Sequence, residues 1–348
     1  MVRRILFALL ALGPVVVALS AFTDVGDMTL FVLAALALIP LAWLIGEATE
    51  HAAHHTGPGI GGFLNATFGN APELIIALIA VNSGLTEVVR GSLTGSVIGN
   101  LLLVLGFSLV FGGSGRLDRE SSLTSFALVA LAVLLFLIPS VPGWEGDPDR
   151  HSLAVVSVPV SIVLLLVYVG VTWYALRRHR SLHVSDEAAV MAAWSLRLSL
   201  GVLAAATVVT ALVAETLVHS LEVFAEEVGL TEFFVAAVIV AIVGNAAEHG
   251  GAVVVAYRGN IKLAAEIALA SSAQVAVFLI PAVALISWLI DPLALSFREV
   301  EILVMGGSVL FTAALLFRGY SSRWRGAVLI AAYAAVAYTF YAVGDRAA

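Results

Sequence analysis

The chain alternates long apolar stretches with short polar segments, and eleven of the stretches are long enough to cross a lipid bilayer. About 20 consecutive, mostly apolar residues form a helix that spans the hydrocarbon core. We therefore predict an all-α integral membrane protein with about eleven transmembrane helices. Two of the spans are weak, because each carries Gly, Asn and Glu; they are the third and the eighth. The predicted spans are 5–22, 28–47, 60–83, 91–113, 122–141, 152–176, 195–218, 231–257, 262–287, 297–317 and 325–343.

The first stretch has a second interpretation. Residues 5–22 follow Arg3 and Arg4 and end in the small residues of "ALSAF", which is also the pattern of a cleaved signal peptide. We favour a retained helix, because the stretch is long and contains Pro14. Cleavage would leave ten spans and would not change their orientation.

The two weak spans contain related sequences, which indicates an internal repeat. The first copy reads "FGNAPELIIALIAVNSG" and then "GSLTGSVIGNLLLVLG"; the second reads "VGNAAEHGGAVVVAYRG" and then "EIALASSAQVAVFLIP". In each copy one helix carries Gly-Asn-Ala-x-Glu, and the next carries a serine followed by a side-chain amide. Without the first helix, each copy has five helices. Since five is odd, the second copy enters the membrane from the opposite side.

Inverted repeats of this kind are typical of secondary transporters, whose site lies near the membrane midplane where the halves meet. The predicted organisation has four parts. It comprises an N-terminal transmembrane helix at 1–27, a first repeat at 28–176, a basic cytoplasmic linker at 177–194 and a second, inverted repeat at 195–348.

Composition supports the membrane assignment and excludes other classes. The 348 residues are 61% hydrophobic and 12% charged, whereas a soluble domain is nearer half apolar and a quarter charged. The net charge of -7 and the absence of a long basic run argue against a nucleic-acid partner. With no cysteine, the chain has no disulfide, no thiolate metal site and no thiol chemistry.

The distribution of basic residues predicts the orientation. Cytoplasmic loops of membrane proteins are enriched in Lys and Arg. With the N-terminus in the cytoplasm, the inner loops hold 13 of the 17 Lys and Arg residues. We therefore expect a cytoplasmic N-terminus and an outer C-terminus, in the inner membrane of a prokaryotic cell. The four outer basic residues are Arg90, Arg150, Arg298 and Arg346.

Glu73 and Glu248 stand near the centres of their spans, 175 positions apart. A charged residue at the bilayer centre costs about 2.5 to 3.5 kcal/mol on insertion scales, and such residues are usually functional. They could instead be permanently protonated structural carboxyls. No Lys or Arg falls in the core of a predicted span, so we expect no salt bridge within the membrane.

The neighbouring residues indicate a cation site built from oxygen atoms. An asparagine three positions before each glutamate shares its helical face, and Gly69, Pro72 and Gly244 loosen the backbone beside it. We place Glu73, Glu248 and the backbone of Gly69 and Gly244 among the metal ligands. Such hard oxygen ligands suit Ca²⁺ better than Mg²⁺, and Na⁺ is acceptable on the same grounds. The other candidate ligands are Asn70, Asn245, Ser96, Asn100, Ser271 or Ser272, and Gln274.

Two buried carboxylates suggest how transport is coupled. Each disfavours ionisation of the other in an empty site of low dielectric constant. One divalent cation or two protons would neutralise the pair, and alternating exposure of such a site gives exchange. A passive cation channel is the other possibility, and counter-flow experiments would distinguish the two.

At these residues the chain resembles the cation/proton exchanger (CAX) family of the cation/calcium exchanger superfamily. The resemblance rests on "GEATEHAA", "GGFLNATFGNAPELI", "GSVIGNLLLVLG", "GNAAEH" and "ASSAQVA", and it spans the second to ninth predicted helices. It implies a Ca²⁺/H⁺ antiporter of eleven helices with Glu73 and Glu248 as the central cation ligands. It also implies that His249 assists proton movement. Na⁺-coupled exchange is the nearest rival, and other divalent cations stay possible. No cofactor is expected, since Ca²⁺ is the transported substrate.

The chain departs from the family between its halves. Eukaryotic members often carry an acidic stretch there, whereas residues 177–194 are basic with only Asp186 and Glu187. Calcium sensing through an acidic helix is therefore not expected.

Further polar residues lie near predicted helix ends. Glu47 and Glu50 belong to "GEATEHAAHH" at the cytoplasmic end of the second helix, and Glu215 lies at the outer end of the seventh. We predict gates that exchange protons with water; ordinary solvated helix ends are the alternative. "HAAHH" also matches a histidine box of membrane di-iron enzymes, but the other histidines are scattered, so we do not predict an enzyme.

Overall fold

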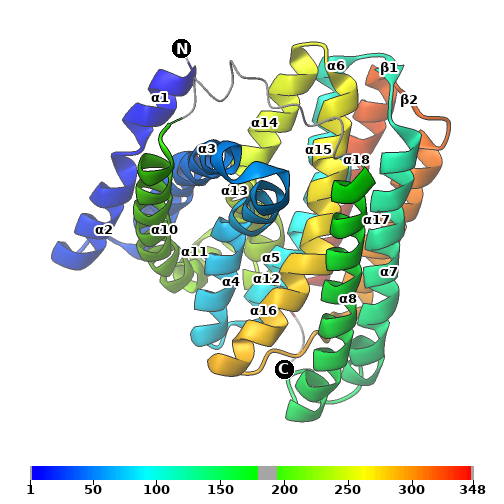
Figure 1. The fold of residues 1–348 in the computed structure, drawn as a ribbon. Coiled ribbons are helices and arrows are strands. Elements are labelled where there is room, and N and C mark those ends of the chain that lie inside the picture. The colour runs from blue at the N-terminus through cyan, green and yellow to red at the C-terminus, as the bar shows by residue number, and fades with distance from the viewer. Residues whose placement is uncertain (1, 179–193, 346–348) are drawn as a thin grey trace.

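The computed structural model describes residues 2–178 and 194–345, and it is helical almost throughout. Helices from the two halves of the sequence pack side by side, and the chain termini lie at opposite ends of the molecule (Figure 1). Most of the predicted linker, residues 179–193, lies outside the described residues.

The first half of the chain contains two short helices followed by a longer series. A turn at Gly84, with φ of 74°, separates α4 from α5, and a π-helical segment, η1, continues α5. The elements are α1 (Val2–Leu9), α2 (Leu12–Phe22), α3 (Asp27–Phe68), α4 (Ala71–Asn82), α5 (Thr86–Ile98), η1 (Gly99–Val104), α6 (Leu105–Gly112), β1 (Gly115–Arg116), α7 (Arg119–Gly143) and α8 (His151–Arg178).

The second half repeats this order in the inverted direction. α4 runs from the centre toward one end of the molecule, and α14 runs from the centre toward the other (Figure 1). The elements are α10 (Leu196–His219), α11 (Leu221–Val228), α12 (Glu232–Phe234), η2 (Val235–Val240), α13 (Ala241–Gly244), α14 (Ala246–Tyr257), α15 (Ile261–Gln274), η3 (Val275–Leu279), α16 (Ile280–Ile286), η4 (Ser287–Leu289), α17 (Glu299–Leu316), β2 (Tyr320–Ser321) and α18 (Arg323–Val343).

Among the described residues, eight helices are long and apolar enough to cross a membrane, and a bent pair raises the number to nine. The all-α membrane fold is therefore confirmed, whereas the count of eleven stays a prediction. Two predicted spans account for most of the difference. The first is divided into α1 and α2, and the third is divided between the end of α3 and the 12-residue α4.

The predicted break between residues 47 and 60 is wrong. α3 continues through this segment and ends at Phe68. Ile45, Ala48, Thr49 and Ala52 are fully buried, so the helical pattern of core-facing residues continues past the predicted helix end. The chain breaks instead at Gly69 and Asn70, inside the predicted third span.

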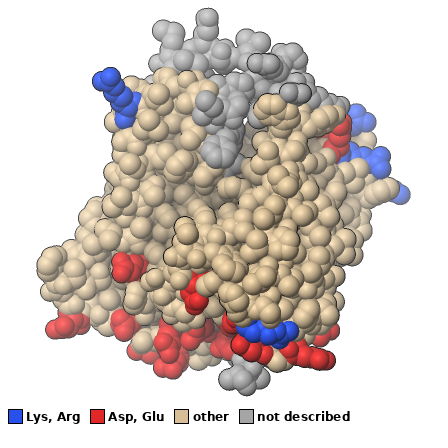
Figure 2. Space-filling model, turned by 60° about the horizontal axis from the view of Figure 1, so that its bottom comes forward, with Lys and Arg blue, Asp and Glu red and all other residues tan. Residues whose placement is uncertain are grey.

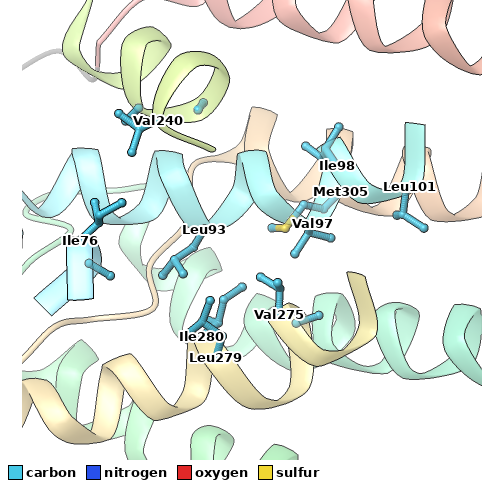
Figure 3. Packing of buried hydrophobic residues seen from close by; sticks show 14 of the residues in the cluster. Ile76, Leu93, Val97, Ile98, Leu101, Val240, Val275, Leu279, Ile280 and Met305 are labelled. Carbon is cyan, nitrogen blue, oxygen red and sulfur yellow. The ribbon is translucent and has the colours of Figure 1, made fainter. Parts of the chain in front are cut away.

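The apolar core joins both repeats. Figure 3 shows Leu93 and Val97 of α5 facing Val275 and Leu279 of η3, with Met305 of α17 beside them. Glycine permits the closest approach. A Cβ atom at Gly95 of α5 would lie 2.0 Å from the carbonyl oxygen of Ala237 in η2, so only glycine fits there.

α3 and α10 pack against each other in opposite directions. The His51 ring of α3 stacks on Trp194, just before α10, at 4.5 Å between centroids. At the other end, Phe31 of α3 stacks on Phe224 of α11 at 4.1 Å. The two helices therefore form an antiparallel pair along one side of the molecule (Figure 1).

Candidate cation site

Two broken helices carry the predicted glutamates. The helix preceding each break ends just before Asn70 or Asn245, and a 12-residue helix, α4 or α14, begins directly after it. Glu73 and Glu248 therefore lie in the first turn of α4 and α14. The free N–H groups at a helix N-terminus favour negative charge. Breaks at this depth are tolerated only where protein or a polar cavity covers them.

Glu73 is buried against the opposite repeat. Its side chain is 7% exposed, and a Cβ atom at Gly244 would lie 3.1 Å from its Cγ. Its Oε2 atom is buried and has no hydrogen-bond partner. Glu248, four residues after Gly244, is half-buried and close enough to interact electrostatically with Glu73. No Lys or Arg among the described residues forms an ion pair with either carboxylate.

Asn245 lies at the centre of a hydrogen-bond network that joins the repeats. Its Nδ2 donates to Ser96 Oγ at 2.8 Å and to the Ala241 carbonyl at 3.0 Å. Its Oδ1 accepts from Asn100 Nδ2 at 3.5 Å, and the same Nδ2 donates to Ser271 Oγ at 3.1 Å. Ser271 in turn donates to the Glu248 carboxylate. Four polar side chains therefore lead from α5 to Glu248.

The remaining amides also bridge the two halves. Asn70 Nδ2 donates to Gln274 Oε1 at 3.5 Å. Ser272, the alternative to Ser271, instead donates to the Val97 carbonyl at 3.0 Å. The structure thus brings the six predicted polar residues and both glutamates together, with Ser271 as the serine that contacts the carboxylate.

Pattern analysis missed two π-helical segments next to these amides. η1 begins at Gly99, beside Asn100, and η3 begins at Val275, beside Gln274. A π-helical turn changes the direction of side chains within a helix and often occurs at functional sites. Apart from Gly99 and Asn100 the two segments are apolar, and no residue pattern marked them as π-helical.

The predicted gate residues lie away from this cluster. Glu47 is 3.7 Å from His51, and Glu50 is exposed on α3. Glu215 is exposed near the end of α10, which runs antiparallel to α3, so the acids occupy opposite ends of the molecule. His249 follows Glu248, and its buried Nε2 has no hydrogen-bond partner.

Two of the arginines are buried within the protein. Arg90 and Arg298, counted above as outer basic residues, are 0% and 7% exposed. Arg90 pairs with Asp149 at 2.7 Å and with Glu87 at 2.6 Å. Arg90 lies in the first turns of α5, just before the predicted span 91–113, so the expectation for the core of the membrane stays a prediction. The sequence pattern did not reveal the Arg90–Asp149 pair, because Asp149 comes from a distant segment.

No group of three or more His, Asp or Glu side chains suited to a metal occurs in the described part of the chain. A cation at the centre would therefore be held by two carboxylates together with amide, hydroxyl and carbonyl oxygens. Such a ligand set is hard and flexible, as Ca²⁺ sites are.

Two inverted repeats that meet at broken helices define a membrane exchanger fold. The chain belongs to the sodium/calcium exchanger protein family, whose model matches residues 27–177 and 198–342. It is 38% identical over 351 residues to the Ca²⁺/H⁺ antiporter ChaA of Bacillus subtilis, covering 97% of this chain and 99% of that one. It is 34% identical to a vacuolar cation/proton exchanger of Arabidopsis thaliana, covering 93% and 74% of the two chains.

Solved structures agree with the fold. The structure of YfkE superposes with a TM-score of 0.83 at 36% identity, covering 97% of this chain and 99% of that chain. The H⁺/Ca²⁺ exchanger CAX superposes with a TM-score of 0.71, covering 98% and 91%; at 18% identity it supports the fold alone. The resemblance noted in the sequence, including the inverted repeats, is confirmed.

Proposed function

We propose that this protein exchanges Ca²⁺ for H⁺ across the membrane by alternating access, with Glu73 and Glu248 sharing the transported cation or protons. One observation carries the proposal. Glu73 from one repeat lies against Gly244 from the other, while Glu248 belongs to the network that joins them. The names of the relatives, a Ca²⁺/H⁺ antiporter and a cation/proton exchanger, support the same pair of substrates.

The geometry supports coupled exchange more than passive flow of the cation through a channel. Two neighbouring carboxylates in a site of low dielectric constant are unfavourable when both are ionised and uncompensated. Ca²⁺ supplies two positive charges at once, and two protons do the same. The protein then changes conformation only when Ca²⁺ or protons neutralise the site. Each cycle therefore moves Ca²⁺ in one direction and protons in the other. Asn70, Asn245, Ser96, Asn100, Ser271 and Gln274 hold and orient the carboxylates or contribute oxygen ligands, together with the backbone of Gly69 and Gly244.

The distribution of charges favours one orientation in the membrane. Acidic side chains gather on the lower face of the molecule, at the ends of α2, α7 and α10 (Figure 2). We propose that this face is outside, with the N-terminus cytoplasmic and the C-terminus outside, in a prokaryotic inner membrane. Glu47 and Glu50 then lie at the inner mouth and Glu215 at the outer one, where each can exchange protons with water. His249, next to Glu248, is placed to pass protons on.

The test is Ca²⁺ uptake into everted vesicles under an imposed pH gradient. We expect uptake by the unchanged protein, and a loss of at least 100-fold for Glu73→Gln and for Glu248→Gln. Glu227→Gln, at an exposed acid on α11, is the matched control and is expected to retain uptake. Uptake that ignores the pH gradient, or that survives both central substitutions, contradicts the proposal. Uptake that follows an imposed Na⁺ gradient instead would identify a Na⁺-coupled exchanger.

A further inference from the structure

Besides Glu73 and Glu248, a further carboxylate is buried among the helices. Glu301 lies in the first turn of α17, and its side chain is 0% exposed. Burying an ionised carboxylate is costly unless hydrogen bonds and opposite charges compensate it. The position of Glu301 therefore depends on the groups that compensate it.

The Glu301 carboxylate accepts hydrogen bonds from two helices. Its Oε2 accepts from the backbone N–H of Arg298 at 2.8 Å, within the capping box that begins α17. Its Oε1 accepts from the Thr94 hydroxyl of α5 at 2.9 Å, and Thr94 is also fully buried. The first bond belongs to α17 alone, whereas the second joins α17 of the second repeat to α5 of the first.

The face of α5 that carries Thr94 has polar contacts over about two turns. Glu87, Arg90 and Thr94 recur at intervals of three and four residues, so they share one side of the helix. Glu87 lies 3.7 Å from Arg298, and Arg90 pairs with Asp149 at 2.7 Å. Residues outside the first repeat and in a distant loop thus hold this side of α5.

Other sides of α5 are fixed by close packing and by a bond to its backbone. Gly95 leaves no room for a side chain between α5 and the carbonyl oxygen of Ala237 in η2. Ser272 of α15 donates to the Val97 carbonyl at 3.0 Å. A rotation of α5 would therefore break a contact on at least one side.

The side of α5 opposite Thr94 carries two residues of the proposed cation site. Ser96 follows Thr94 by two positions, which turns its side chain by about 200° around the helix axis. Asn100 lies about one turn further, in η1. Ser96 accepts from Asn245, and Asn100 donates to Ser271. A rotation of α5 would therefore move both residues relative to their partners in the site.

We propose that Glu301 is a positioning residue of the cation site. Through its hydrogen bond with Thr94 it fixes the rotation of α5, and thereby the positions of Ser96 and Asn100. Glu301 acts through α5 and not as a ligand. The inference rests on the proposed function for the identity of the transported ion.

Thr94→Val tests the contact, because valine has nearly the shape of threonine but no hydroxyl. The Glu301 Oε1 atom then loses its donor from α5, and a buried charged acceptor without a donor is unfavourable. We expect α5 to shift and KM for Ca²⁺ to rise about 3- to 10-fold with kcat unchanged. Thr94→Ser keeps the hydroxyl and is expected to restore most of the loss.

Thr312→Val is the matched control. Thr312 is a fully buried threonine on the same helix as Glu301, and its hydroxyl has no hydrogen-bond partner in the described part of the chain. The substitution changes the same atoms without removing a contact, so KM should stay unchanged. Both parameters come from Ca²⁺ uptake into everted vesicles under an imposed pH gradient, with the amount of folded protein determined by gel filtration.

The two kinetic parameters separate positioning from general stabilisation. A contact that only stabilises the fold would lower the amount of folded protein and the maximum rate, but not change KM. Unchanged KM for Thr94→Val, an equal rise for Thr312→Val, or no restoration by Thr94→Ser overturns the proposal.

Repeating Thr94→Val in a Glu301→Met background tests the other partner. Methionine is about as long as glutamate and offers no carboxylate oxygen, so the Thr94 hydroxyl has no bond there to lose. We expect Thr94→Val to raise KM in the unchanged protein and not in the Glu301→Met protein. An equal rise in both backgrounds overturns the role of Glu301, and the comparison of Thr94 with Thr312 decides where Glu301→Met does not fold. Failure of the proposed function is distinguishable, because the unchanged protein would then show no Ca²⁺/H⁺ exchange.

Discussion

Gly244 and Glu73 come from opposite repeats, and a Cβ atom added at Gly244 would lie only 3.1 Å from Glu73 Cγ. The glycine thus lets a helix of the second repeat pass directly over a carboxylate of the first. Contact of this kind fixes the position of the carboxylate relative to the Glu248 helix.

Gly244→Ala tests this contact. The added methyl group displaces Glu73 by a few tenths of an ångström, so we expect KM for Ca²⁺ to rise about 10-fold, because the carboxylate is moved relative to the other proposed ligands. Gly250→Ala, on α14 with no atom within 4 Å of the new Cβ, is the matched control and should transport normally. The measurement is Ca²⁺ uptake in vesicles against Ca²⁺ concentration. Equal KM values for the two variants would show that Glu73 moves freely.

Ser271 and Ser272 are adjacent and chemically identical, yet only Ser271 contacts a glutamate. Ser271→Ala removes a donor from the Glu248 carboxylate and a partner from Asn100. We expect Ca²⁺ affinity to fall about 10- to 100-fold, equivalent to about 1.4 to 2.7 kcal/mol. Ser272→Ala should change affinity little, because its hydroxyl bonds only to a backbone carbonyl. Isothermal titration with Ca²⁺ compares them, and similar losses would argue against a specific role for Ser271.

Asn245 uses both of its amide protons, toward Ser96 and the Ala241 carbonyl. Asn245→Asp replaces the donating NH₂ group by a carboxylate oxygen, which only accepts hydrogen bonds. This oxygen then lies against two other oxygen atoms, Ser96 Oγ and the Ala241 carbonyl oxygen. We expect Ca²⁺ uptake to fall at least 10-fold. Asn260→Asp is the control, because Asn260 caps α15 through its Oδ1, which a carboxylate can replace. Normal uptake by Asn245→Asp would mean that the network does not orient the site.

Arg90 is the largest fully buried side chain among the described residues, and its loss removes a cation that lies 2.6 Å from Glu87 and 2.7 Å from Asp149. Removing one partner of a buried ion pair typically costs about 3 to 5 kcal/mol. We therefore expect Arg90→Gln to lower the free energy of unfolding in detergent by that order, measured by thermal and denaturant unfolding. Arg116→Gln, at an exposed arginine, should lower it by less than about 1 kcal/mol. Equal stabilities would show that the Arg90 cluster is not stabilising.

The sequence predicted the elements whose signals are local. Glu73 and Glu248 are conspicuous because a charge within an apolar span is costly, and the repeated Gly-Asn-Ala-x-Glu motif places both at helix breaks. The structure contains both the buried glutamates and the helix breaks. The cost of placing a charge in an apolar span does not depend on how the helices are arranged, so these features could be predicted without the fold. Whether each named residue binds the cation stays a prediction.

Features that depend on tertiary contacts could not be predicted. The choice between Ser271 and Ser272 depends on the rotation of α15, and the burial of Arg90 depends on Asp149, which lies in a distant loop. The path of α3 past residue 47 depends on what covers Ala48 and Ala52. Local sequence carries none of this information.

The repeats also differ in their mechanical construction. α3 extends without a break over 42 residues, a contour of about 63 Å, whereas its counterpart is divided at Ser220 and bends by 110° between α11 and the helix that follows. One continuous helix therefore connects the beginning of α3 to Asn70, whereas the chain between α10 and Asn245 passes through two interruptions. The two repeats therefore join their first helix to the broken helix in different ways, and we expect the same change at each first helix to shift Asn70 and Asn245 to different extents.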